Sequence, residues 1–99
     1  MLAMLKFEWD PAKAKRNLAK HGVRFELAAR VFDDPFALMS QDRVEGDEER
    51  WQAIGRVGTH LVLVVAHAAR HVKGTDTIRI ISARRALRHE RQRYDDQAF

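Results

Sequence analysis

The feature that most restricts the fold is a series of strand-like segments joined by tight turns in the middle and second half of the chain. These segments alternate or cluster apolar and β-branched residues, as strands do. Their predicted bounds are Phe36–Val44, Glu49–Val57, Leu61–Arg70 and Thr77–Ser82. The connections contain turn residues such as Gly46, Gly58 and Gly74, and none has room for the crossover that parallel neighbours need. We therefore expect a four-stranded antiparallel sheet, with the valine-rich segment Leu61–Ala66 buried inside it.

Helical signals flank this sheet on both sides. Asp10 followed by Pro11 is typical of a helix start, and Gly22 fits the end of that helix. Apolar residues at helical spacing between Phe25 and Phe32 predict a second short helix. A last helix is expected over 82–94, with Ser82 as its N-cap rather than a nucleophile. The fold class is therefore α+β, with two N-terminal helices, the sheet covered on one face, and a C-terminal helix.

Length and composition exclude several classes of protein. The chain has 99 residues, 45% of them hydrophobic, which fits one domain over residues 1–99 and argues against general disorder. Without cysteine there is no disulfide and no thiolate metal site. No apolar run approaches the roughly 20 residues of a membrane helix, and the apolar start, Met1–Leu5, is too short for a signal peptide. We expect a cytoplasmic protein, with Phe7–Trp9 forming a short strand or an extended lead-in.

The distribution of charge indicates a polyanionic ligand. Residues 33–49 contain seven acids and one base, Arg43, a net charge of −6; because the whole chain carries +4, the remainder carries +10. Six arginines fall between Arg79 and Arg93, with Glu90 as the only acid among them. Such a surface attracts nucleic acid. The alternative is an arginine-rich helix face that is simply solvated.

Arg79 lies among isoleucines in the last predicted strand. Ile78 and Ile80 point to one face, and Arg79 and Ile81 to the other. An arginine in such surroundings needs a partner, because an isolated buried charge is costly. That partner is either an acid such as Glu90 or the phosphate of a ligand, which a guanidinium binds through paired hydrogen bonds.

The predicted final helix carries Glu90 on the same stripe as Leu87 and Tyr94. Glu90 either holds an arginine in place, which we favour, or acts as a general base with a raised pKa. A neighbouring stripe of Arg84, Arg88 and Arg91 repels itself, and a bound anion would explain it.

His67 is a candidate for proton transfer, although a half-buried histidine bonded to backbone is equally consistent with its position. It shares a strand face with Leu63 and Val65, whereas Arg70 points to the opposite face. A bulge near the strand end would be needed to bring His67 and Arg70 together. The five histidines show no metal-ligand spacing, so we expect no metal and no other cofactor.

Several motifs together resemble the BrnT toxin family. They run in order over nearly the whole chain: Phe7-Glu8-Trp9-Asp10, Lys20-His21-Gly22-Val23, Phe32-Asp33-Asp34-Pro35, Arg50-Trp51, Gly55, Arg79-Ile80-Ile81-Ser82-Ala83-Arg84, Glu90-Arg91 and Tyr94. Each motif alone is weak, but their combination is specific.

The resemblance implies a RelE-like fold and metal-independent cleavage of RNA. It also implies a BrnA-like antitoxin partner with a DNA-binding domain of the ribbon-helix-helix type, the two proteins together repressing their own promoter. One departure is visible, because Ala68 and Ala69 stand where many family members carry an acid before the arginine equivalent to Arg70. If that acid assists catalysis, another group must replace it here.

We therefore expect an endoribonuclease in which arginines stabilise the charge on the scissile phosphate. The predicted site residues are Arg79, Arg70 and Arg84 for that phosphate, His67 or Glu90 as base or acid, and Arg88, Arg91, Arg50 and Lys20 for other parts of the RNA. Two alternatives stay open, a non-catalytic nucleic-acid-binding part of a repressor complex and a subunit that only docks the antitoxin. A homo-oligomer is compatible with the sequence, and no membrane association is expected.

Overall fold

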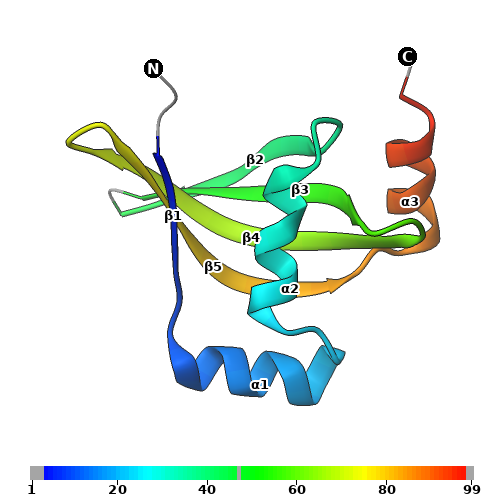
Figure 1. Cartoon of the computed structure of the whole chain (residues 1–99), viewed down its shortest axis with the longest axis horizontal. Helices are drawn as coiled ribbons and strands as arrows, with labels where there is room; N and C mark the ends of the chain where they lie inside the picture. Colours follow the sequence, from blue (N-terminus) through cyan, green and yellow to red (C-terminus); the bar gives the residue numbers. More distant parts are fainter. Residues whose placement is uncertain (1–3, 47, 98–99) are drawn as a thin grey trace.

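The computed structural model describes residues 4–46 and 48–97, which form one mixed five-stranded sheet with three α-helices and a 3₁₀ turn (Figure 1). The elements in chain order are β1 Met4–Glu8, α1 Pro11–His21, α2 Phe25–Ala29, the 3₁₀ helix η1 Arg30–Asp33, β2 Leu38–Glu45, β3 Glu48–Val57, β4 Leu61–Val72, β5 Thr75–Arg85 and α3 Arg88–Asp95. The strand order is β1-β5-β4-β3-β2. The strands β2 to β5 form the antiparallel meander that the turns predict.

The prediction of four antiparallel strands is wrong at the N-terminus. The segment Met4–Glu8 is a fifth strand, and it pairs in parallel with β5 from Thr75 to Arg79. This pairing joins segments that are far apart in the chain, and β1 is too short to show a periodic pattern of its own. This segment is a strand instead of an extended lead-in because it pairs with the edge of β5.

The final helix also begins later than predicted. β5 continues to Arg85, and the helix starts at Arg88 rather than after Ser82. Ser82 pairs with Ala66 of β4 instead of capping a helix, and a bulge leaves Ile81 without a partner in that register. The N-cap of the helix is Leu87, whose N–H donates to Glu90 Oε1 at 2.8 Å. Ladder pairing with β4 thus outweighs the helix propensity of this segment.

The two predicted N-terminal helices are confirmed. Asp10 accepts a hydrogen bond from the N–H of Ala12 at 2.8 Å, which caps α1. Gly22 ends the helix with a φ of 71°, a left-handed conformation that glycine adopts at little cost. α2 then begins at Phe25 and continues into η1.

Both faces of the sheet bury apolar side chains, which contradicts the expectation that the helices cover one face. Leu63 and Val65 of β4 pack with Phe25 and Val31 from α2 and η1. The alternate residues of β4, including Val64, pack against Tyr94 of α3 on the other face. α3 stands at the end of the sheet where β3 turns into β4, while the β4–β5 turn lies at the opposite end (Figure 1). That opposite end of the second face carries charged side chains.

Asn17 joins α1 to the edge of β5. It is buried, with 7% of its surface exposed. Its Nδ2 donates to the carbonyl oxygens of Val23 at 3.0 Å and Ala83 at 2.8 Å, and its Oδ1 accepts from the N–H of Ala83 at 3.0 Å. The amide therefore bonds to both backbone groups of Ala83, as a neighbouring strand would. It does so beyond Arg79, the residue at which the described pairing with β1 ends.

Replacing Asn17 with Ala should lower the free energy of unfolding by about 3 kcal/mol, because three buried backbone groups lose their partners. Denaturant unfolding followed by circular dichroism measures this difference. Lys15→Ala, an exposed change on the same helix, serves as the control and should stay within about 0.5 kcal/mol of the wild type. A loss below about 1 kcal/mol for Asn17→Ala would mean that water replaces the amide.

Candidate functional site

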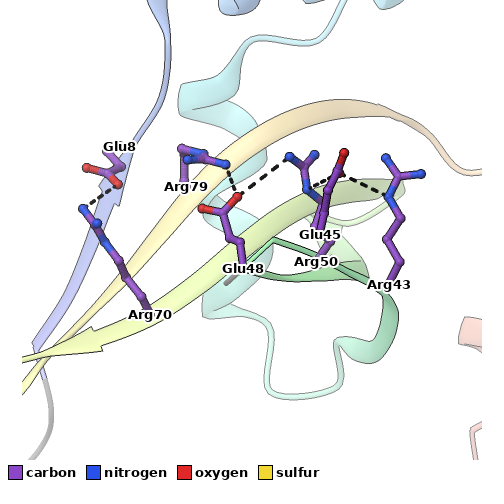
Figure 2. A network of polar contacts seen from close by, with 7 residues as sticks. All are labelled: Glu8, Arg43, Glu45, Glu48, Arg50, Arg70 and Arg79. Carbon is purple, nitrogen blue, oxygen red and sulfur yellow. Dashed lines mark hydrogen bonds and ion pairs between the residues drawn. The ribbon is translucent and has the colours of Figure 1, made fainter.

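A chain of arginines and glutamates crosses the open end of the second face (Figure 2). We call it the arginine–glutamate face, and each of the five described strands contributes to it. Its members are Glu8 on β1, Arg79 on β5, Arg70 on β4, Glu48 and Arg50 on β3, and Arg43 and Glu45 on β2. The four arginines exceed the three glutamates by one positive charge.

The strand register explains why these side chains meet. Glu8 pairs with Arg79, Arg79 with Ala68, Ala68 with Arg50, and Arg50 with Arg43. Paired residues on adjacent strands point to the same side of a sheet. Ala68 at the centre is small and 3% exposed, so the longer side chains on both sides of it can converge above it.

Arg70 and Glu48 extend this row towards the turns. Arg70 is two residues beyond Ala68 and therefore shares its face. Arg70 Nη2 lies 3.2 Å from Glu8 Oε1, and Arg79 Nη2 donates to Glu48 Oε1. Glu8 and Glu48 therefore supply carboxylates to these arginines from β1 and β3, at a place where β4 itself carries Ala68 and Ala69.

The β2 side of the face is also paired. Glu45 Oε2 lies 3.1 Å from Arg50 Nε and 3.5 Å from Arg43 Nε, and Glu48 Oε1 lies 3.8 Å from Arg50 Nη2. The buried Nε of Arg50 nevertheless has no hydrogen bond of good geometry among the described residues. Ion pairs with Glu45 and Glu48 therefore orient Arg50, while its Nε–H is still able to donate a hydrogen bond.

These arginines are accessible to a ligand. The side chains of Arg70 and Arg79 are 64% and 40% exposed. Ion pairs at such exposure contribute little to stability. The hollow between Glu8, Glu48, Arg70 and Arg79 has a volume of about 10 Å³, room for about one water molecule. A phosphate group would therefore bind above the hollow or displace a carboxylate from an arginine.

His67 lies on the other face of the sheet. The residue is 3% exposed, and its ring packs edge-on against Phe32, with ring centroids 4.8 Å apart. Its Nδ1 lies 3.2 Å from the carbonyl oxygen of Val65. Burial lowers the pKa of His67, and the bond to Val65 offsets only part of that effect. The bulge opposite Ala66 and His67 is in β5, and it does not bring His67 to Arg70.

Glu90 and Arg84 form a separate pair. Arg84 Nη1 and Nη2 donate to the two carboxylate oxygens at 2.6 and 2.8 Å. The hydrogen bond from Arg84 lowers the pKa of Glu90 to about 2, against the opposing effect of burial. The expectation of a raised pKa is therefore wrong, and the alternative in which Glu90 holds an arginine is the one observed. The β4 partners of Arg84 and Arg79 are Val64 and Ala68, about 13 Å apart along the strand.

The other predicted contacts with RNA are dispersed. Because β5 extends to Arg85, Arg84 does not share a helix stripe with Arg88 and Arg91, which contradicts that prediction. Arg88 and Arg91 are exposed on α3, and Arg91 Nε lies 4.0 Å from Asp95. Lys20 is exposed in the last turn of α1. The structure therefore brings together Arg50, Arg70 and Arg79 from the predicted set.

A second polar cluster, around Asp34 and Tyr94, was missed from the sequence. The Tyr94 hydroxyl donates to Asp34 Oδ2 at 2.5 Å, and the N–H of Arg56 donates to the same oxygen at 2.8 Å. Burial and the Asp34 carboxylate raise the pKa of Tyr94 to about 12. Burial acts to raise the pKa of Asp34, but its hydrogen bonds lower it overall. A cavity of about 360 Å³ lies beside this cluster. The hydrogen bond between Tyr94 and Asp34 connects α3 to the segment before β2.

Two further observations concern metals and membranes. In residues 4–46 and 48–97, no group of three or more histidine or acidic side chains is placed to hold a metal ion. No helix in the described part of the chain is long and apolar enough to span a bilayer.

Comparison with known proteins points to one family. Residues 9–90 match the family described as "Ribonuclease toxin, BrnT, of type II toxin-antitoxin system". The chain is also similar to the 1.1 Å crystal structure of the Brucella abortus ribonuclease toxin BrnT, with a TM-score of 0.61 and 28% sequence identity. That similarity covers 86% of this chain and 99% of the Brucella chain. No curated protein matches the chain. The predicted family resemblance is confirmed, and Glu8 lies just outside the matched range.

The Arg84–Glu90 pair should make the free energy of unfolding depend on pH. At neutral pH, Glu90→Gln should lower the free energy of unfolding by about 1–2 kcal/mol, because a charge-assisted pair is lost. The ordinary pKa of 4.5 is lowered to about 2 in the fold, so this stabilisation is present above pH 4.5 and is lost as the pH falls towards 2. Denaturant unfolding of both proteins across this range tests it. A difference that stays constant down to about pH 2 would contradict it.

Proposed function

The chain belongs to the BrnT family of ribonuclease toxins of type II toxin–antitoxin systems, and we propose that its own catalytic site is the arginine–glutamate face. In this proposal the chain cleaves RNA without a metal ion, and a bound antitoxin blocks the cleavage. The family membership supports the substrate class. The geometry of this chain supports the position of the site.

The observation that carries the proposal is the juxtaposition of Arg70 and Arg79. They come from adjacent strands, share the uncovered face, and are each oriented by one carboxylate, Glu8 and Glu48 respectively. Arg79 pairs with Ala68, which is two residues from Arg70, so the two arginines are diagonal neighbours about 7–8 Å apart. Their long side chains can span this distance and bond oxygens of one phosphate. Fixed cations of this kind stabilise the charge that accumulates on a phosphoryl group during its transfer.

The carboxylates give the site a base as well as cations. When phosphate oxygens bond to Arg79, they compete with Glu48 for the same guanidinium donors. The released Glu48 carboxylate is then free to take the proton of the ribose 2′-hydroxyl. The 2′-oxygen forms a bond to phosphorus as the bond to the 5′-oxygen breaks, and that leaving oxygen takes a proton from water. The products are a 2′,3′-cyclic phosphate and a 5′-hydroxyl end.

This proposal moves the acid–base role away from His67 and Glu90. His67 is buried on the opposite face with a lowered pKa. Both carboxylate oxygens of Glu90 accept hydrogen bonds from Arg84. We therefore propose a structural role for the Arg84 guanidinium instead of binding to the scissile phosphate. Arg50 lies next to Glu48 on the same face and is proposed to bind a phosphate beside the cleaved one. Arg88 and Arg91 of α3 stay candidates for more distant parts of the RNA.

The proposed partner is a BrnA-like antitoxin with a DNA-binding domain of the ribbon-helix-helix type, acting with this chain at their own promoter. The family resemblance supports this part of the proposal. It also supports a wider relationship to RelE-type toxins and a cytoplasmic location, where the RNA substrate is found.

Arg79→Ala should reduce the rate of RNA cleavage by about 10²- to 10³-fold, because a cation at the phosphoryl group is lost. The measurement is cleavage of labelled RNA by the purified chain in excess chelator. Arg85→Ala removes an exposed arginine from the end of the same strand and should retain full activity. If the wild type does not cleave, or if Arg79→Ala cleaves as fast as the wild type, the proposed site is wrong.

Glu48→Gln should lower the cleavage rate about 100-fold, because the general base is lost while the size of the side chain is kept. The acid limb of the pH–rate profile should disappear with it, which a residue that merely orients Arg79 would not cause. His67→Gln is the comparison variant, and if folded it should keep the wild-type profile. Loss of cleavage in folded His67→Gln, with Glu48→Gln active, would return the role to the histidine.

A further inference from the structure

Helix α1 carries a basic stripe that the proposed reaction does not use. Lys13, Arg16 and Lys20 recur at spacings of three and four residues, so they lie on one side of the helix. All three are exposed, and within the described residues no ion pair joins any of them to a carboxylate. The sequence of α1, Pro11–His21, contains no acid at all. Like charges at this spacing repel one another, so the stripe favours an external anion.

The stripe forms one wall of a groove. A cavity of about 320 Å³ lies between Lys13, Arg16, Lys20 and His21 on α1 and Ile81 and Ser82 on β5. The described β1 pairing ends at Arg79, so β1 does not cover the edge of β5 at this point, where Asn17 bonds the backbone of Ala83. A hollow with cations on one wall and strand backbone on the other suits a phosphate chain.

Asn17 holds this groove in shape. It belongs to the same side of α1 as the basic stripe, and its amide bonds both backbone groups of Ala83. These contacts fix the distance between α1 and the β5 edge. The cations therefore stand on a rigid element rather than on a mobile loop.

The groove lies close to the proposed catalytic arginines. Ile81 and Ser82 are two and three residues beyond Arg79 on β5, which corresponds to about 7–10 Å along the strand. Figure 1 shows α1 running beside this edge of the sheet. RNA held at Arg79 could therefore continue over the edge of β5 and reach Arg16 and Lys20 within a few nucleotides.

We propose that the groove between α1 and the β5 edge is a second RNA-binding site, which holds backbone phosphates on one side of the cleaved bond. The inference rests on the proposed function for its substrate class, but its position depends on a different set of residues. Contacts to phosphates give affinity without sequence selection. The groove would thus make the enzyme prefer RNA long enough to fill both sites.

The test compares two double variants of the full chain that remove equal charge. Arg16→Gln/Lys20→Gln removes two of the three cations of the basic stripe. Lys15→Gln/Arg24→Gln removes two exposed cations around another hollow, beside Trp9 and Pro11. The probes are fluorescent 2′-O-methyl RNAs, a dinucleotide and an oligomer of about 12 nucleotides, whose methylated 2′-oxygens prevent cleavage. Binding is measured by anisotropy at several salt concentrations, after thermal melts confirm that the variants are folded.

The groove variant should bind the long probe about tenfold more weakly than the wild type. The slope of the logarithm of the binding constant against the logarithm of the salt concentration should be smaller in magnitude by about 1.4, because two phosphate contacts are lost. It should bind the dinucleotide like the wild type, and the control variant should bind both probes like the wild type. The inference is overturned if the long probe is unaffected, if both variants lose affinity equally, or if the dinucleotide weakens as much as the oligomer. An unchanged long probe with weakened antitoxin binding would assign the groove to the antitoxin.

These results separate the inference from the proposed function. Binding is read with RNA that cannot be cleaved, so the groove can be established even if the chain proves inactive on natural RNA. Conversely, the chain could cleave RNA while its groove variant binds the long probe like the wild type. That result would support the proposed function and overturn only the second RNA-binding site.

Discussion

The alternation of side chains along β4 is the constraint on which the rest of the structure depends. One set of alternate residues, including Leu63 and Val65, is apolar and packs under α2 and η1. The other set begins with Val62 and Val64 but ends with Ala68 and Arg70. Because only the first part of that second set is apolar, α3 covers only that part, and the end that carries Arg70 stays open.

The open end becomes the proposed site because a small residue is surrounded by long ones. Ala68 is buried at the centre of a row that includes Arg79 and Arg50 on the adjacent strands. Glu8 and Glu48 restrict the arginines to this area, although ion pairs so exposed contribute little to folding. In the proposed mechanism, the same carboxylates that orient the arginines leave a net positive charge for phosphate, and Glu48 serves as the base. In this proposal, the orientation of the arginines and the reactivity of the site depend on a single set of contacts.

Parts of this arrangement could be predicted because their causes are local. The helix from Pro11 to His21 follows from Asp10 and Gly22, whose capping effects extend only a few residues. The placement of His67 and Arg70 on opposite faces follows from strand periodicity alone. The Arg84–Glu90 pair joins residues only six positions apart, but the sequence indicated Arg79 as an arginine that Glu90 could pair with and assigned Arg84 to phosphate binding. The late start of α3 was missed because the pairing of β5 with β4 overrides local propensity.

The sequence by itself determined the family, the strand meander, the two N-terminal helices and the concentration of arginines between residues 79 and 93. These properties depend on motifs, periodicity and charge, which are all visible within short windows of the chain. Only the tertiary structure decided that β1 is a strand, that Arg79 pairs with Glu48 rather than Glu90, and that His67 faces away from the arginines. The register of distant strands selects such partners, because a shift of one residue would turn every side chain to the opposite face. No local pattern records that register.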